Sequence, residues 1–330
     1  MTDINPQDIA DDLIEHLDNW YAMPETYDNE LDTQIHRWYS EAPNIYPKRP
    51  YFSPSAATAC PRELFYKAKR ASKDSFRKQP HQGRWTSIGT AIGGIIQRDI
   101  LAMERNLEDK TGAASRFRFE RTAKGFPMFE EFAKKNHPVT HGNKSFYLFG
   151  LPDGILEYTT EYGEVIRVGL EVKSKQSTPA RTSLYSMKQA EGKHVKQCVC
   201  YAEMYNVDYY VILYVNAAHK GWTISDEDYR KNPDIRAFGL QITDDDKAQV
   251  FDRFVKVLDS VERNEPLPLD IDNFTFNSYK EIIAKELPQK DFDELQGYAR
   301  RVAHSDLPAF QKANVAKAAA QLDELREAAE

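Results

Sequence analysis

The strongest constraint on the fold is a pair of strand-forming segments on either side of one short turn. Residues 154–158 and 165–173 are rich in β-branched, aliphatic and aromatic residues, whereas residues 159–164 have the composition of a turn. In an antiparallel hairpin, residues that face each other lie symmetrically about the turn. The midpoint between Asp153 and Glu171 falls inside this turn. The sequence therefore predicts that these two carboxylates face each other at the open end of a β-hairpin.

Two facing carboxylates need a compensating charge, because like charges repel across a sheet. A divalent cation supplies that charge, since carboxylate oxygens are ligands that Mg²⁺ and Mn²⁺ prefer. The two-residue period of a strand places Lys173 on the same face as Glu171. The same period turns Val172 into the core and leaves its carbonyl free as a further oxygen ligand. Two acids and a lysine around a cation are what metal-dependent phosphodiester cleavage requires, with the lysine orienting the attacking water.

Each half of this pattern also has a simpler interpretation. Pro-Asp-Gly at residues 152–154 is a common turn tripeptide, so Asp153 alone is more typical of a turn than of a metal site. Glu-x-Lys on an exposed strand is usually a solvated ion pair. The prediction of a site therefore depends on the mirror register of the two motifs.

The composition is typical of a soluble globular protein. The chain has 330 residues, of which 41% are hydrophobic and 29% are charged. No apolar stretch approaches the roughly 20 residues that cross a membrane, and the N-terminus has no features of a secretory signal. Three cysteines do not form a disulfide framework in a chain of this length, so we expect a cytoplasmic protein.

The net charge of −7 argues against nucleic-acid binding, but the charges are unevenly distributed. Residues 1–45 contain eleven acidic residues and one arginine, whereas residues 62–84 contain eight basic and two acidic residues. Residues 167–196 form a second basic segment. Two basic segments that precede or contain the carboxylates suggest a path for phosphates. The candidate DNA contacts are Arg62, Lys67, Arg70, Arg84, Lys175, His194 and Lys196.

The order of elements indicates an α/β protein with a mixed sheet, not a doubly wound dinucleotide-binding fold. Apolar spacing predicts helices over residues 7–23, 53–70, 85–104, 185–205 and 244–263, with irregular structure at 24–52. Further strands are predicted at residues 146–149, 208–216 and 237–242. We divide the chain into an acidic helical segment (1–52), a core (53–268) and a helical tail (269–330).

The helix predicted at residues 185–205 follows the strand that contains Lys173. Gln197 and Tyr201 are four residues apart and share a helix face with His194. Amide and phenol groups on that face can bind a phosphate or position a water. For one tyrosine alone, a half-buried aromatic is the simpler interpretation.

Asp153, the segment 171–173 and Gln197-x-x-x-Tyr201 together resemble the PD-(D/E)XK nuclease superfamily. The resemblance is to the branch with RecB nuclease domains, lambda-type exonucleases and CRISPR adaptation nucleases, and it covers residues 53–265. It implies a restriction-endonuclease-like core with a central mixed β-sheet flanked by helices. It also implies catalytic roles and bound Mg²⁺ or Mn²⁺. The implied ligands are Asp153, Glu171 and the Val172 carbonyl, and the implied catalytic residues are Asp153, Glu171, Lys173, Gln197 and Tyr201.

The chain departs from this branch at two points. The branch usually has His or Glu four residues after Gly89, where this chain has Gly93. Gln97, one turn later, is the substitute ligand that we expect, with Asp99 or a water as alternatives. Relatives with an iron–sulfur cluster need four thiolates, and this chain has three cysteines. We therefore expect no cluster and a buried Cys60.

The sequence thus predicts a Mg²⁺- or Mn²⁺-dependent exonuclease that acts on single- or double-stranded DNA ends in recombination, repair or phage replication. Three alternatives remain open. One is a sequence-independent endonuclease or nickase with the same site, and another is an inactive DNA-binding protein on the same fold. The third is a protein whose acidic ends, at residues 1–45 and 262–330, bind a basic partner. A recombination or replication protein is a partner that such acidic termini would suit.

Overall fold

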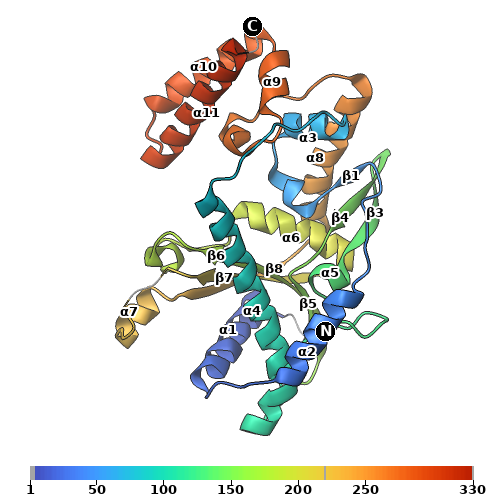
Figure 1. Cartoon of the computed structure of the whole chain (residues 1–330), viewed down its shortest axis with the longest axis vertical. Coiled ribbons are helices and arrows are strands. Elements are labelled where there is room, and N and C mark those ends of the chain that lie inside the picture. The colour runs from blue at the N-terminus through green and yellow to red at the C-terminus, as the bar shows by residue number, and fades with distance from the viewer. Residues whose placement is uncertain (1–3, 219–220, 329–330) are drawn as a thin grey trace. The chain divides into compact units, whose positions relative to one another are not determined.

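A computed structural model of the chain describes residues 4–218 and 221–328. These residues form two compact units, which we describe separately (Figure 1). Unit 1 contains the residues up to Ser55 together with Lys78–Val139 and Phe146–Ala248. Unit 2 contains Ala56–Arg77, Thr140–Ser145 and the residues from Gln249 onward. The domain boundaries that the sequence suggested, at residues 52 and 268, stay predictions.

The centre of unit 1 is a five-stranded mixed sheet in the order β2-β5-β6-β7-β8. Strands β6 and β7 are parallel, and the other three neighbouring pairs are antiparallel. The strands are β2 (Phe117–Phe119), β5 (Gly154–Thr159), β6 (Val165–Lys175), β7 (Tyr209–Asn216) and β8 (Ile235–Gln241). Since parallel neighbours need a crossover, the chain passes through a helix between β6 and β7.

A smaller sheet has the order β1-β4-β3, with β1 parallel to β4. Its strands are β1 (Tyr51–Phe52), β3 (Lys135–His141) and β4 (Lys144–Gly150). The predicted fold class, α/β with a central mixed sheet flanked by helices, is therefore confirmed. Among residues 4–218 and 221–328, no helix combines the length and the hydropathy that a membrane span needs.

Helices cover both faces of the five-stranded sheet. Helix α1 (Pro6–Ala22) packs on β7 and β8, and α4 (Pro80–Thr111) packs on β2 and β6. Helix α6 (Gly192–Tyr205) packs on β6 and β7 from the side opposite α1 (Figure 1). At Gly239 of β8, a Cβ atom would lie 1.8 Å from the carbonyl oxygen of Pro6, so this close approach of α1 requires glycine.

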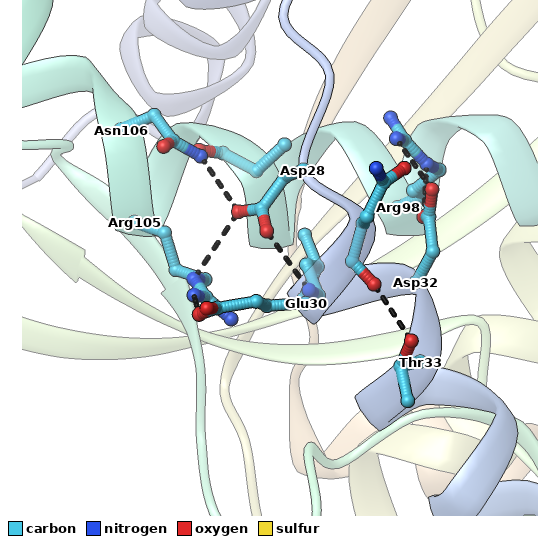
Figure 2. Close-up of polar contacts among 10 residues, drawn as sticks. Asp28, Glu30, Asp32, Thr33, Arg98, Arg105 and Asn106 are labelled. Carbon is cyan, nitrogen blue, oxygen red and sulfur yellow. Dashed lines mark hydrogen bonds and ion pairs between the residues drawn. The ribbon is translucent and has the colours of Figure 1, made fainter.

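The prediction of irregular structure at residues 24–52 is wrong, because α2 (Asn29–Glu41) forms there. Leu31 is the buried residue of this helix, and Ile35 and Trp38, at helical spacing, are partly buried against the same core, so its apolar stripe is short. Polar contacts also join it to α4 (Figure 2). Asp28 accepts from the Leu31 N–H at 2.8 Å and pairs with Arg105 at 3.3 Å. Asp32 pairs with Arg98 at 2.7 Å, so part of the N-terminal acidic excess is neutralised within unit 1.

Most of the predicted elements are present, with shifted ends. Helix α4 extends over more residues than the predicted helix at 85–104 and ends where Gly112 adopts a left-handed conformation (φ 77°). Helix α6 begins at residue 192 instead of 185. The sequence interpretation did not include β1, β2, β3 and the short helices α5 (Glu130–Ala133) and α7 (Asp226–Lys231).

Unit 2 is helical and has a hydrophobic core of its own. Its helices are α3 (Pro61–Ala68), most of α8 (Asp244–Arg263), α9 (Lys280–Glu286), α10 (Gln289–Ala303) and α11 (Ala309–Glu327). Cys60 is buried as predicted and packs in one cluster with Phe65, Phe274, Ile283 and Leu322. The segment before α4 therefore shares a core with the C-terminal helices.

The contacts of Asp28 predict a measurable stabilisation of unit 1. Asp28→Ala removes the cap of α2 and the pairing with Arg105, and we expect the free energy of unfolding to fall by about 1–2 kcal/mol. Glu30→Ala is the matched control, because Glu30 contacts the same arginine from an exposed position. Glu30→Ala should lower the free energy of unfolding by less than about 0.5 kcal/mol. Equal losses in urea unfolding would contradict the capping role.

Candidate active site

The hairpin of β5 and β6 has the register predicted from the sequence. Gly154 lies opposite Leu170, and the following residues of β5 continue this symmetry. Asp153 and Glu171 therefore occupy the next facing positions at the open end of the hairpin. The backbone N–H of Val172 donates to the Asp153 carboxylate at 2.7 Å, and the Val172 side chain packs against the core.

Lys173 and Gln197 complete a closed set of contacts around Glu171. The Lys173 ammonium forms an ion pair with Oε1 of Glu171, and the Gln197 amide donates to the same oxygen at 2.8 Å. The Lys173 ammonium also lies 3.4 Å from Oε1 of Gln197. Glu171 is only 1% exposed, and its other oxygen, Oε2, is buried without a hydrogen-bond partner among the described residues. That oxygen could therefore accept a hydrogen bond or bind a cation.

Gln97 is the second residue with an unused buried oxygen. Its Nε2 donates to the carbonyl of Asp153 at 2.9 Å, while its Oε1 is buried without a partner in the described part of the chain. The alternative candidate, Asp99, accepts instead from the Tyr21 hydroxyl at 2.6 Å. At Gly93, a Cβ atom would meet no atom within 4 Å. The space for the ligand that this chain lacks is therefore open.

Tyr201 and His194 support the site from α6. The Tyr201 hydroxyl donates to the carbonyl of Leu151 at 2.5 Å, which fixes the turn that leads into Asp153. The His194 Nδ1 lies 2.9 Å from the Tyr214 hydroxyl. Burial, and next the charge of Lys173, lower the pKa of His194 to about 4. This imidazole is therefore neutral near pH 7 and contributes no positive charge to a phosphate site.

A cavity of about 580 Å³ is lined by Asp153, Lys173 and His194, whereas Glu171, Gln97, Gln197 and Tyr201 are not among the residues that line it. It includes an acid that sequence reasoning missed, Glu130, whose N–H donates to the Pro152 carbonyl at 2.8 Å. Glu130 has a positive φ of 41°, and its carboxylate accepts from the Tyr39 hydroxyl at 2.7 Å. Nothing in the sequence around it resembles a motif. The lining includes Gly89, Gly93, Glu130, Asp153, Lys173, Lys175, Lys193 and His194.

Burial makes it costly to ionise Asp153 and Glu171 together. Burial raises the pKa of Asp153 to about 6, with a further contribution from Glu130. Burial, and next the neighbouring Asp153, raise the pKa of Glu171 to about 8. Burial lowers the pKa of Lys173, but the carboxylates of Glu171 and Asp153 raise it more. The charge of Lys173 therefore does not restore the ordinary pKa values of the two acids.

Any bound ion would rely on neutral oxygens as well as on the two facing acids. Among the described residues, no group of three or more His, Cys, Asp and Glu side chains is arranged as a ready-made metal site. The candidate donors are the carboxylates of Asp153 and Glu171, Oε1 of Gln97 and, as the sequence predicts, the carbonyl of Val172. All four are hard oxygen donors, which suits Mg²⁺ or Mn²⁺.

The predicted DNA contacts differ in how accessible they are. Arg62 was a wrong choice, because it is 3% exposed and binds the Leu267 carbonyl at 2.6 Å and Asp291 at 3.3 Å within unit 2. Lys175 lines the cavity and forms an ion pair with Glu191. The remaining side chains stay predictions: Arg84 and Lys196 are exposed on unit 1, Arg70 is exposed on unit 2, and Lys67 is half-buried there.

The raised pKa of Glu171 predicts how stability depends on pH in the presence of a chelator. A carboxyl whose pKa is raised on folding stabilises the fold below its unfolded pKa, and this contribution is lost as the pH rises through the folded pKa. We expect the melting temperature to fall as the pH rises from about 4.5 through about 8. Glu171→Gln, which stays neutral, should remove much of that fall. Glu157→Gln, on the same hairpin, is the control and should show the same fall in melting temperature as the wild type. If Glu171→Gln shows that fall as well, the pKa of Glu171 is not its cause.

No protein-family profile matches the chain, and no curated protein matches it in sequence. Among solved structures, the chain is similar to SSO0001, at 13% identity and a TM-score of 0.36, over 79% of this chain and 94% of that one. It is also similar to an alkaline exonuclease from Laribacter hongkongensis, at 9% identity and a TM-score of 0.36, over 69% and 95% of the two chains. The same exonuclease in complex with dAMP matches at 12% identity and a TM-score of 0.36, over 64% and 88%. Similarity at this level assigns no activity, so function is argued from the site itself.

Proposed function

We propose that this protein is a Mg²⁺- or Mn²⁺-dependent deoxyribonuclease that hydrolyses phosphodiester bonds at the cavity of unit 1. The observation that carries the proposal is the facing pair Asp153 and Glu171, which lies beside Lys173 and leaves Oε2 of Glu171 without a partner among the described residues. Buried like charges with an unused oxygen fit a divalent cation. The unused oxygen of Gln97 and the carbonyl of Val172 extend the same donor set.

Each group at the cavity has a role that follows from its contacts. Mg²⁺ or Mn²⁺ held by Asp153, Glu171 and Oε1 of Gln97 would polarise the scissile phosphate and lower the pKa of a water. Lys173, held by Glu171 and Gln197, orients the attacking water and offsets the charge that develops on the phosphate. Tyr201 keeps the turn before Asp153 in place.

The substrate follows from the charges around the cavity. Lys175 and Lys193 line it, and Arg84 and Lys196 are exposed on the same unit. Phosphates along a DNA strand are the anions that such a group of cations attracts. We infer exonuclease rather than endonuclease action from the sequence resemblance alone, and with it a cytoplasmic role at DNA ends in recombination, repair or phage replication.

Two other functions are consistent with the same observations. A nickase or endonuclease would have the same site and differ only in how DNA reaches it. An inactive DNA-binding protein is favoured by one specific observation, the absence of a side chain at Gly93 where a ligand would have room.

Cleavage of linear and closed circular DNA separates these functions. With Mg²⁺ or Mn²⁺, we expect the full chain to degrade end-labelled linear DNA and to leave closed circles intact. Glu171→Ala should reduce the rate by about 10³-fold or more, since it removes a ligand and the partner of Lys173. Glu157→Ala is the control, because Glu157 pairs with Arg118 away from the cavity.

Each outcome of this experiment decides between the functions. Cleavage of the circle would favour the endonuclease. Absence of cleavage with either ion, or equal rates for wild type and Glu171→Ala, would contradict the proposed site. Circular dichroism spectra of the variants show whether a loss of activity reflects unfolding.

The open space at Gly93 predicts that a third acid can be added. Gly93→Glu should be accommodated, because a Cβ there meets no atom within 4 Å and glycine is the less favourable residue in a helix. We expect the dissociation constant for Mn²⁺, measured by titration calorimetry, to fall by about tenfold, as one added charged ligand is worth about 1–2 kcal/mol. Gly83→Glu, at another open position of α4, should leave it unchanged. Unchanged affinity in Gly93→Glu would place the ion elsewhere.

A further inference from the structure

Unit 2 contains a second cavity, of about 510 Å³, which has no part in the proposed cleavage. Two chain segments form its walls, residues 73–76 and 275–281, and Gln321 and Leu325 of α11 close it. Asp74 joins the two segments, because its carboxylate accepts from the backbone N–H groups of Lys280 at 2.6 Å and Glu281 at 3.2 Å. The cavity therefore has a fixed frame.

Two phenylalanines at this cavity are exposed to solvent. Phe76 is 73% exposed and Phe276 is 87% exposed, and each lies on one of the two segments. Exposed aromatic rings at the rim of a polar cavity are typical of a binding surface. Planar rings in such positions can stack on other flat groups, including nucleic-acid bases.

Asn277 supplies a hydrogen-bond donor that has no acceptor. The residue is 5% exposed and lines the cavity. Its Oδ1 accepts from the Tyr279 N–H at 2.8 Å, which fixes the orientation of the amide. Its Nδ2 is buried without a partner among the described residues. A buried donor left unpaired is costly, so a ligand with a carbonyl or ring-nitrogen acceptor would satisfy it.

Basic side chains outnumber acidic ones in residues 69–78, which include one wall of the cavity. Lys69, Arg70, Lys73 and Arg77 are exposed, and none of them forms a hydrogen bond or an ion pair through its side chain within the described residues. Two nearby acids already accept hydrogen bonds from the backbone. Asp74 accepts from the backbone of α9, and Glu63 accepts from the Ser278 N–H at 3.2 Å. Glu281 also lines the cavity and places a negative charge there.

We propose that this cavity binds a single-stranded nucleic acid. Its bases stack on Phe76 and Phe276, a base acceptor receives the Nδ2–H of Asn277, and its phosphates lie along Lys73 and Arg77. Alternating flat acceptor groups and negative charges are the chemistry of a single strand, and they match alternating rings, a donor and cations. The site would hold a strand independently of cleavage in unit 1, so it goes beyond the proposed function.

Binding of a labelled oligothymidylate to the full chain, followed by fluorescence anisotropy in a chelator, tests this site. The double variant Phe76→Ala/Phe276→Ala should raise the dissociation constant by about tenfold or more, because two stacked bases are lost. The same variant should bind an abasic strand of equal length as the wild type does. Arg77→Gln should reduce the slope of log Kd against log salt by about 0.7.

The control is Phe310→Ala, which removes an exposed phenylalanine of unit 2 that does not line the cavity. It should leave binding unchanged. Wild-type affinity in the double variant would overturn the proposal. So would an equal loss of affinity for the abasic strand, or competition by polyglutamate at the same charge concentration, because an acidic peptide would then be the better ligand.

This result can be separated from that of the nuclease experiment. Binding is measured in a chelator, so this readout does not depend on cleavage in unit 1, which lies in the other unit. Cleavage of linear DNA without any effect of the phenylalanine variants on binding would refute this site alone. Base-dependent binding without cleavage would support this site and refute the proposed function.

Discussion

The facing of Asp153 and Glu171 across the β5–β6 hairpin is the constraint on which the rest of the site depends. The sheet pairs the two strands in a register that brings the half-buried Asp153 to the buried Glu171, and the Val172 N–H holds the Asp153 carboxylate. Lys173 and Gln197 then bind a single oxygen of Glu171. Oε2 of Glu171 is left without a partner among the described residues, which is the feature that the proposed cation would satisfy.

The helices around the hairpin position this pair. Helix α6 brings Gln197 and Tyr201 to one side of it, and α4 brings Gln97. A polar interface with α2 and a close approach of α1 at Gly239 secure the sheet itself. The chemistry therefore rests on elements of unit 1 that are far apart in sequence.

Much of this site could be predicted because strand register is a local property. Symmetry about one turn determined which residues face each other, and the spacing of Gln197 and Tyr201 determined a shared helix face. Glu130 could not be predicted in this way, since it reaches the cavity through a backbone contact with Pro152 that has no sequence signature. Arg62 was misassigned for a related reason: a run of basic residues does not show which of them is buried against Asp291. Helix α2 was missed because its apolar stripe of Leu31, Ile35 and Trp38 is short, and charge pairs with α4 help to hold it in place.

The most direct test of the cation site is a crystal structure of the full chain with Mn²⁺, measured near the manganese absorption edge. The account predicts an anomalous difference peak bound by Asp153 and Glu171, with the carbonyl of Val172 and Oε1 of Gln97 or water completing the oxygen ligands. It also predicts that Lys173 releases Glu171 to some degree when the ion is present. A peak elsewhere, or no peak at saturating Mn²⁺ with the Lys173–Glu171 pair unchanged, would contradict it.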